Sequence, residues 1–347
     1  MKTINLLLLS GLFALMSVTG QVSARERVDI SLFSWPGYGF WFIAKEKDLM
    51  PELELNIRLI EDPYESFSMM SAERLDVTSS TVEYGPIAAA EGVPVRMVAY
   101  TNPSYGVDKI ILRPEFETAR DLIGESVGVL EGGLTQIFMA IWLEENGVSF
   151  DQVNYRNLIM DDAVSSMVGG NIAAAEFWEP FGSQILEILD GAHVAATSSE
   201  DYWIETALLG DGMYMSESFI EQRPEVAAKV MAAYFKAVDF WKANPEEANQ
   251  IIADGLRFPV SDVEMVIGST GETHEGGIHI FSSDESARFM GLMDGEPPLG
   301  LTNGQIHDHW KLTSTWWEKF GLINEVKETS AGIEFSVMES MLSNGGE

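Results

Sequence analysis

Apolar and polar positions alternate along the chain in a way that predicts repeated strand–turn–helix units. The first unit has an apolar strand over 28–33 (VDISLF), a turn over 34–41 (SWPGYGFW) and a helix over 42–49. Two glycines and a proline let the backbone bend sharply in this turn. Ligands of open α/β sheets lie beyond the carboxyl ends of strands, where this turn falls. We therefore expect Trp35 and Tyr38, which flank the glycines, to form the wall of a binding site.

The same order continues through the first third of the chain. A strand is expected over 53–60 and a helix over 64–75, and a short strand from residue 76 then runs into the hydroxyl-rich Ser79 and Ser80. Small hydroxyl residues before a helix are common N-caps. They also stand at a strand end, so a ligand contact is an equally good interpretation of Ser79 and Ser80.

A second series of units begins at residue 126. A glycine turn over 131–136 (EGGLTQ) precedes a helix over 137–146 that is apolar on almost every side and should therefore be buried. Free amides and the positive end of the helix dipole favour an anionic ligand group at its start, which makes Gly133 and Thr135 candidate contacts. The turn has neither a phosphate-loop lysine nor a full dinucleotide-binding glycine pattern.

Carboxylates join aromatic residues at a third strand end. A strand over 172–175 leads into 176–181 (EFWEPF), and a segment over 206–215 is expected to return the chain to its first lobe before a mainly helical remainder. Aromatic faces attract cations, and a carboxylate adds a charge-assisted hydrogen bond. We expect Trp178 and Glu179 to contact a ligand with an amine or another cationic nitrogen.

The beginning of the chain predicts export. An apolar run follows Lys2, and Val22, Ser23 and Ala24 form a small-x-small cleavage site, which together are typical of a secretory signal peptide. No second long apolar run follows, and the chain has no cysteine. We expect the mature protein in a bacterial periplasm, without disulfides or a lipid-anchored cysteine.

Composition narrows the classes of function. Asp and Glu number 54 against 21 Lys and Arg, so the formal net charge is −33. Nucleic acid is therefore not an expected partner, because binding it requires a basic surface. The acidity predicts a well-solvated surface, and some of the carboxylates could also line a cleft for a cation. The five histidines fall in no standard metal-binding spacing, and no catalytic motif is present, so neither a metal, a cofactor nor an enzymatic activity is expected.

Four stretches in a fixed order resemble a known family. The chain is similar to the periplasmic substrate-binding proteins of nitrate, sulfonate and taurine ABC importers, with their relatives that bind thiamine precursors. The stretches are 34–49, 74–77 with 86–95, 122–129, and 169–180 (GGNIAAAEFWEP). The resemblance implies a type II binding-protein fold, in which two α/β lobes joined by two crossing strands clamp a small solute. It also implies an ABC permease as partner and a monomeric protein without a cofactor.

The expected organisation follows from these assignments. Its parts are a signal peptide (1–24), the first segment of lobe 1 (25–112), lobe 2 (113–205), the lobe 1 return with C-terminal helices (206–330), and a tail (331–347).

The chain departs from the sulfonate-binding members at several positions. Those members usually carry Ser and Thr where this chain has Gly133 and Leu134, and small residues where it has Glu176 and Glu179. The departures favour a zwitterion such as taurine or a heterocycle such as an aminopyrimidine over a bare anion. Two other functions remain open, an enzyme of pyrimidine-precursor synthesis on the same fold and a receptor module for a membrane sensor.

Overall fold

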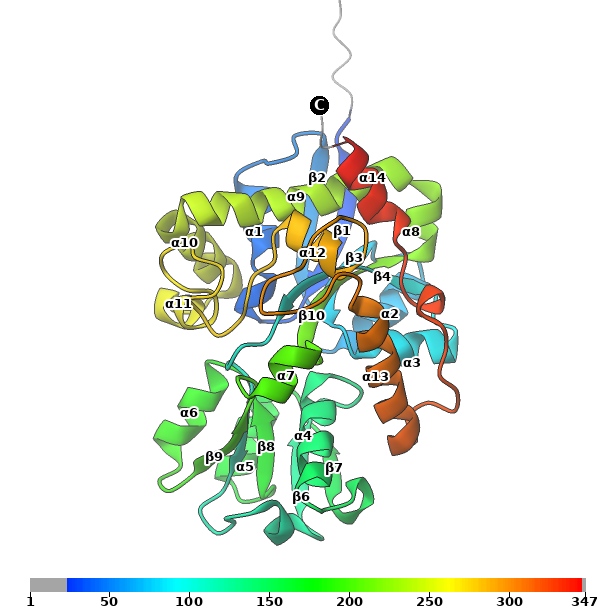
Figure 1. Ribbon diagram of the computed structural model, residues 1–347. Helices are drawn as coiled ribbons and strands as arrows, with labels where there is room; N and C mark the ends of the chain where they lie inside the picture. Colours follow the sequence, from blue (N-terminus) through cyan, green and yellow to red (C-terminus); the bar gives the residue numbers. More distant parts are fainter. Residues whose placement is uncertain (1–23, 345–347) are drawn as a thin grey trace, which may run out of the picture.

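The computed structural model describes residues 24–344 as two α/β lobes stacked one above the other, which confirms the predicted fold class (Figure 1). The predicted signal peptide, except for Ala24, lies outside the described residues. Over 24–344, no helix combines the length and the apolar character needed to cross a membrane.

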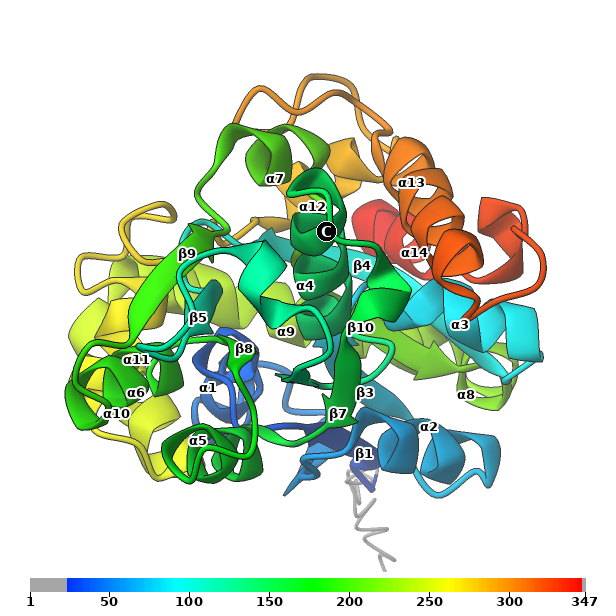
Figure 2. The ribbon, with the colours of Figure 1, turned by 90° about the horizontal axis from the view of Figure 1, so that it is seen from below.

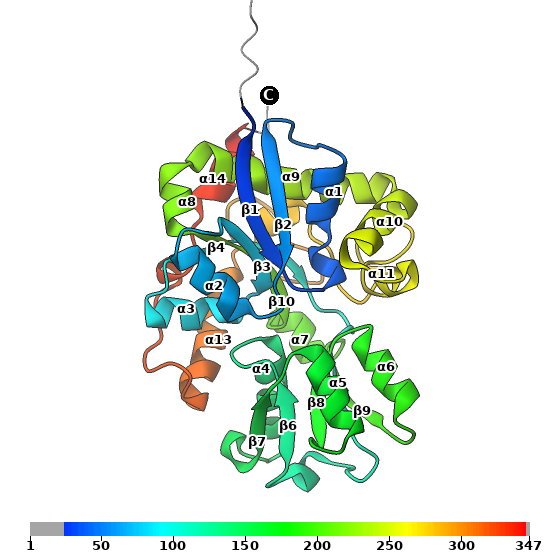
Figure 3. The ribbon, with the colours of Figure 1, turned by 180° about the vertical axis from the view of Figure 1, so that it is seen from behind.

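The first lobe is built on a five-stranded mixed sheet in the order β2-β1-β3-β10-β4 (Figure 3). β1 runs parallel to β2 and β3, whereas β10 runs antiparallel to both of its neighbours. The strands are β1 (Glu26–Leu32), β2 (Leu53–Leu59), β3 (Val77–Thr81), β4 (Val95–Pro103) and β10 (Gly210–Ser216). The predicted return of the chain to lobe 1 is therefore strand β10, which lies next to the centre of the sheet.

The second lobe has a sheet of the same size in the order β7-β6-β8-β5-β9. Its strands are β5 (Lys109–Leu112), β6 (Ser126–Val129), β7 (Asn154–Asn157), β8 (Ala174–Phe177) and β9 (His193–Thr197). β5 pairs with β8 and β9 in this sheet. The expected lobe boundary after residue 112 is thus corrected to a position before residue 109, because backbone pairing and not sequence proximity decides the lobe of a strand.

Helices cover both sheets (Figures 1 and 3). Those that follow lobe 1 strands are α1 (Phe40–Glu46), α2 (Pro63–Ser71), α3 (Tyr84–Glu91), α8 (Glu217–Gln222), α9 (Pro224–Ala243), α10 (Pro245–Leu256), α11 (Val260–Ile267), α12 (Ser283–Phe289), α13 (Ile306–Phe320) and α14 (Ser336–Asn344). Those that follow lobe 2 strands are α4 (Leu134–Glu145), α5 (Met160–Val168), α6 (Phe181–Ile188) and α7 (Asp201–Thr206). Short 3-10 turns are η1 (Pro36–Tyr38), η2 (Ala119–Leu122), η3 (Phe150–Gln152) and η4 (Thr329–Ala331).

Helix α4 confirms the pattern-based expectation of burial. Every residue from Leu134 to Leu143 is buried, because the helix packs on β8 and β6 of its own lobe while its start faces lobe 1. Figure 2, which looks at lobe 2 from below, shows α4 near the centre of the molecule.

The chain crosses between the lobes twice, after β4 and before β10, and hydrogen bonds tie the two crossings together. The Ser104 hydroxyl donates to the Ser198 hydroxyl oxygen at 2.6 Å, and the Gly106 amide donates to the same oxygen at 2.9 Å. Two adjacent crossing segments form a natural hinge for lobe closure.

Helix α13 begins among lobe 1 residues and ends in the core of lobe 2. Ile306 and Trp310 belong to the main hydrophobic cluster, whereas Trp317 and Phe320 belong to the cluster formed mostly by lobe 2 residues. Phe320 stacks on Phe150 with ring centroids 4.5 Å apart. α13 therefore braces the two lobes alongside the hinge (Figure 1).

The region beyond residue 330, expected as a tail, folds onto lobe 1 as far as Asn344. The Met97 amide donates to the Gly332 carbonyl at 2.9 Å, and helix α14 packs against α9. Val337, Met338 and Met341 are buried there. Apolar residues spaced one turn apart account for this packing.

Candidate functional site

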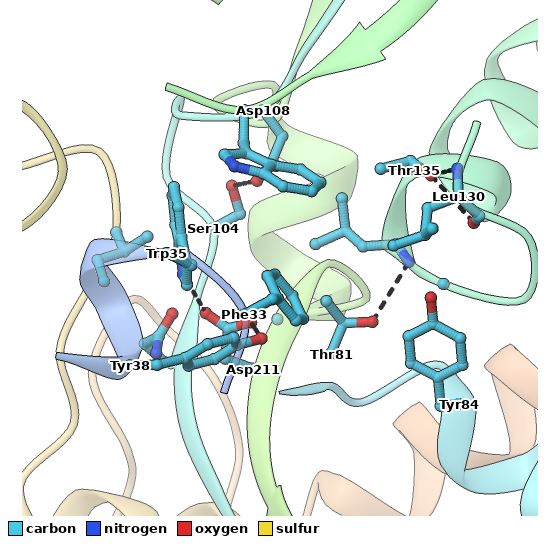
Figure 4. Close-up of a pocket in the computed structure, with 16 residues that line it drawn as sticks. Phe33, Trp35, Tyr38, Thr81, Tyr84, Ser104, Asp108, Leu130, Thr135 and Asp211 are labelled. Carbon is cyan, nitrogen blue, oxygen red and sulfur yellow. Dashed lines mark hydrogen bonds between the residues drawn. The ribbon is translucent and has the colours of Figure 1, made fainter. Parts of the chain in front are cut away.

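A narrow pocket with a cavity volume of about 30 Å³ lies between the lobes (Figure 4). Lobe 1 and its crossing segments contribute most of the wall, and the turn before α4 and the end of β8 close it from lobe 2. The lining residues are Phe33, Trp35, Tyr38, Thr81, Tyr84, Asn102, Ser104, Asp108, Leu130, Gly133, Leu134, Thr135, Trp178, Gly210, Asp211 and Ile278. Five of the eight residues predicted from the sequence line this pocket, namely Trp35, Tyr38, Gly133, Thr135 and Trp178.

The turn after β1 brings its two predicted residues to one carboxylate. The indole Nε1 of Trp35 donates to Asp211 Oδ2 at 3.0 Å, and the Tyr38 hydroxyl donates to Asp211 Oδ1 at 2.5 Å (Figure 4). A Cβ on Gly37 would lie 2.5 Å from the Trp35 Nε1, so only glycine lets the indole fold back over this turn. The turn therefore positions two hydrogen-bond donors as well as two aromatic rings.

Asp211 is the most informative residue that sequence reasoning missed. It is 5% exposed, and burial raises the pKa of its carboxyl to about 7, while the bonds from Tyr38 and Trp35 act in the opposite direction. The sequence does contain a clue to this residue. Asp211 is the one charged residue of strand β10 and stands between Gly210 and Gly212. An acidic residue inside a buried strand needs a partner or a function.

Aromatic rings from both lobes meet at the pocket. The Trp178 ring lies 5.7 Å from Phe33 and 6.3 Å from Trp35, centroid to centroid. The Trp178 Nε1 is buried and has no hydrogen-bond partner in the described structure. The rings of the two lobes therefore pack on one another at inclined angles, with the unpartnered Trp178 donor buried among them.

The start of α4 forms the opposite wall, and two of the amides there already have acceptors within the protein. The Gly132 amide donates to Gln136 Oε1 at 2.7 Å, and the Leu134 amide reaches Thr81 Oγ1 in lobe 1 at 3.4 Å. Thr135 Oγ1 accepts from the Leu130 amide at 2.6 Å. The expectation that this helix start holds an anionic group is therefore weakened.

Gly133 instead contributes to the pocket by having no side chain. A Cβ at this position would lie 2.5 Å from the Tyr84 hydroxyl oxygen and 2.8 Å from the ring carbon that carries it. The Tyr84 hydroxyl is buried without a hydrogen-bond partner among the described residues, and it points toward the turn at Leu130 (Figure 4). The absence of a side chain at Gly133 thus makes room for Tyr84 in the pocket wall.

Ser79 and Ser80 do not line the pocket. Ser79 Oγ accepts a hydrogen bond from the Trp41 indole at 2.8 Å, and the Ser80 hydroxyl is buried without a partner in the described structure. Both serines lie inside β3, whose last residue, Thr81, is the one that reaches the pocket. The sequence placed the hydroxyl pair correctly near the strand end but missed the position that lines the site by one residue.

Glu179 is also absent from the pocket lining, which corrects the assignment that carried the cationic-ligand argument. Its carboxylate forms an ion pair with Lys109 and accepts from the Ser183 amide at 2.9 Å, so it holds β5 and the start of α6. The side chain of Glu179 is only 6% exposed. Its charge is satisfied within lobe 2 and is not available to a ligand.

Two acidic residues other than Glu179 and Asp211 lie at or next to the pocket. Asp108 lines the pocket from the first crossing segment, and burial raises the pKa of its carboxyl to about 6. Glu176 lies behind it. This glutamate is within β8, which begins two residues later than predicted, and burial followed by the neighbouring Asp108 charge raises its pKa well above the usual range. A protonated Glu176 can donate a hydrogen bond to Asp108.

Acidic residues line the pocket and cationic ones do not. None of its sixteen lining residues is Arg, Lys or His, while Asp108 and Asp211 are both carboxylates. An anionic ligand would face these carboxylates without a counter-charge, at a cost that a helix terminus does not offset. A flat ligand that donates hydrogen bonds from nitrogen suits the aromatic walls and the two carboxylates.

The histidines do not line the pocket. His279 is buried and stacks on His274 at 6.1 Å, and burial lowers the pKa of His279. Over residues 24–344, no three His, Cys, Asp or Glu side chains are grouped closely enough to hold a metal ion.

Two α/β lobes with a pocket between them at the crossing segments are typical of the fold of the periplasmic binding proteins, and solved structures agree. The alkanesulfonate-binding protein of Xanthomonas axonopodis superposes with a TM-score of 0.70 at 14% identity, covering 90% of this chain and 99% of that one. The nitrate-binding protein of Synechocystis gives 0.71 at 12% identity, covering 92% and 89%. A desulfurization enzyme has a related fold, with a TM-score of 0.59 at 12% identity over 92% of this chain and all of that one.

The chain belongs to the NMT1/THI5-like family, whose model matches residues 35–248. A formylaminopyrimidine-binding protein of Halalkalibacterium halodurans is 22% identical over 89% of this chain and 91% of its own length. A putative binding protein of Brucella abortus is 26% identical over 45% of this chain. This match spans 49% of the Brucella protein, about half its length. The suspected family is thus confirmed.

Proposed function

We propose that this protein is the exported solute-binding component of an ABC importer and that its solute is a flat nitrogen heterocycle of the aminopyrimidine class. The observation that carries the proposal is Asp211, a buried carboxylate held by Trp35 and Tyr38 at an aromatic pocket without a lining cation. An exocyclic amine or protonated ring nitrogen would donate to this carboxylate, while the ring would stack between aromatic walls.

Ligands of the taurine, sulfonate and nitrate type fit less well. An oxyanion could accept from the unpartnered Trp178 Nε1 and Tyr84 hydroxyl, but it would also face Asp108 and Asp211 without a lining cation. The amides of Gly132 and Leu134 are already bonded within the protein. The nearest lysine, Lys109, is paired with Glu179. The named substrate of the Halalkalibacterium relative, a formylaminopyrimidine, supports the heterocycle. The alternatives of an enzyme or a sensor module gain no specific support from the pocket, which has no lining histidine or cysteine.

A thermal-shift and calorimetry panel tests the proposal. It should contain 4-aminopyrimidines, taurine, an alkanesulfonate and nitrate. A ligand at about 100 times its dissociation constant adds roughly 2.7 kcal/mol to the free energy of unfolding, which shifts the transition measurably. We expect aminopyrimidines alone to stabilise the protein. Stabilisation by nitrate or a sulfonate, with none by an aminopyrimidine, would overturn the heterocycle assignment.

The transport role needs its own measurement. The protein should bind the permease encoded beside it in detergent or nanodiscs, and it should do so as a monomer in light scattering. Activation of a neighbouring sensor kinase by the ligand-bound protein would favour the receptor function instead. Binding alone does not separate the two functions, because a permease and a sensor would both recognise the closed form of the lobes.

A further inference from the structure

A second cavity adjoins the pocket on the side away from Asp211. This outer cavity has a volume of about 200 Å³ and shares Phe33, Leu130 and Trp178 with the inner pocket. The Phe33 and Trp178 rings, 5.7 Å apart and inclined at 39°, stand between the two spaces. A ligand in the inner pocket would therefore lie beside the outer cavity, with the apolar side chains of Phe33, Leu130 and Trp178 in between.

The walls of the outer cavity are aromatic. Phe181 from the start of α6 and Phe258 from the loop before α11 join Phe33 and Trp178. The Phe181 ring meets Trp178 edge-on, with centroids 6.2 Å apart. Aromatic faces attract a cation, most strongly when the cation is desolvated.

Each lobe adds one carboxylate to this cavity. Glu61 comes from lobe 1 and Asp161 from the first turn of α5 in lobe 2. The Ser34 hydroxyl and amide donate to the two Glu61 oxygens at 2.6 and 3.2 Å, which fixes that carboxylate at the cavity wall. Neither acid forms an ion pair within residues 24–344, and no Arg, Lys or His lines the cavity.

Trp178 supplies an independent sign of a ligand. Its side chain is in the walls of both cavities, the residue is 9% exposed, and its buried Nε1 donor has no partner in the described structure. A buried N–H donor without an acceptor is unfavourable, and an acceptor on the solute, such as a ring nitrogen of the heterocycle, would satisfy it.

From these contacts we propose that the outer cavity is a second subsite, which binds a cationic substituent on the same solute. The solute is then a two-part molecule, a flat nitrogen heterocycle in the inner pocket and a positively charged group between Glu61 and Asp161. This inference rests on the proposed function, since the heterocycle positions the charged group. Because Glu61 and Asp161 belong to different lobes, the charged group also links the lobes in the closed state.

Three probes test the subsite by calorimetry. The parent is a 4-aminopyrimidine with a methyl group at C5. The second carries a 2-(trimethylammonio)ethyl group there, and the third carries the neutral carbon isostere, 3,3-dimethylbutyl. We expect the cationic probe to bind at least about five-fold more tightly than the isostere. The gain should be clearly smaller in the Glu61→Gln, Asp161→Asn double variant, which keeps only the aromatic walls, and persist in Asp162→Asn, which removes the neighbouring exposed charge that does not line the cavity.

The outcomes separate the two proposals. If the parent binds but the cationic probe and its isostere bind equally, the subsite is wrong and the inner-pocket function stands. An equal gain in the wild-type protein and the double variant indicates general attraction to the acidic surface, which also overturns the subsite. If no aminopyrimidine binds at all, the proposed function fails and the subsite fails with it.

Discussion

The Tyr38 hydroxyl donates a 2.5 Å hydrogen bond to Asp211 although 173 positions separate the two residues in the chain. The bond joins the first strand-to-helix turn to the strand that returns from lobe 2. Replacing Asp211 with Asn keeps the shape and removes the charge. We expect aminopyrimidine affinity to fall about ten-fold or more, in line with the 1.5–3 kcal/mol of a charged hydrogen bond.

Calorimetry measures this change, and Asp190→Asn, an exposed position outside the pocket, is the matched control. Unchanged affinity in Asp211→Asn would mean that the carboxylate serves only the fold.

Buried carboxyls predict how stability changes with pH. Burial raises the pKa of Asp108 to about 6 and that of Asp211 to about 7, and it raises those of Glu83 and Glu176 further. A carboxyl whose pKa is higher in the folded than in the unfolded protein adds to the stability of the fold. This contribution is complete below the pKa of the unfolded chain, about 4, and is lost as the pH rises through the pKa of the folded protein. The ligand-free protein should therefore have a lower urea midpoint at pH 8 than at pH 5.

Asp211→Asn should reduce that difference, because Asn does not titrate. A midpoint that rises between pH 5 and pH 8 would show that these carboxyls are ionised in the folded protein throughout.

The Lys109–Glu179 ion pair should matter for stability and not for binding. Both partners are mostly buried, with 20% and 6% of their side chains exposed. Breaking a buried pair costs up to about 3–5 kcal/mol, and less for Glu179→Gln because the amide oxygen still accepts a hydrogen bond. We expect urea unfolding to show a loss of about 1–3 kcal/mol and ligand affinity to stay within about three-fold. A ten-fold loss of affinity at unchanged stability would restore Glu179 to the site.

Lobe closure should be visible in solution. Candidate contacts in both lobes, such as Trp35 and Trp178, predict that a ligand shifts an open ensemble to a closed one. Small-angle scattering should show a smaller radius of gyration at saturation. Phe320→Ala, which removes the stack on Phe150, should expand the ligand-free protein, whereas Ile188→Ala at an exposed apolar position should not. An unchanged radius with ligand would contradict closure.

The predicted cleavage site can be checked directly. Peptidase recognition of Val22 to Ala24 gives a mature chain that starts at Arg25, one residue before β1. Mass spectrometry of the protein released from the periplasm should find this start. Retention of the full-length chain in the cytoplasm would remove the basis for the export prediction.

The local residue pattern was enough to predict the first strand-to-helix turn, but it could not predict which distant residue its side chains contact. Glycine and proline spacing placed Trp35 and Tyr38 at a strand end, and the structure brings both to the pocket. Asp211 joins them only through the strand order of the sheet, in which β10 pairs with β3. The alternation of apolar and polar residues within a strand does not specify which strand it pairs with.

The error at Glu179 has a related cause. Its position after a strand resembled that of Trp178, but a lysine 70 positions earlier in the chain neutralises it. A carboxylate contributes charge to a site only if nothing else in the fold has already paired with it, and sequence distance hides such pairs.

The brace formed by α13 has a consequence for protein engineering. Residues 109–197 form the entire second sheet as one uninterrupted insertion, which makes lobe 2 an obvious module to exchange between relatives. Its core, however, is completed by Trp317, Phe320 and Ile323 from the far end of the chain. A chimaera that takes the insertion alone would leave an apolar surface uncovered, so the end of α13 must be transplanted together with the lobe that it covers.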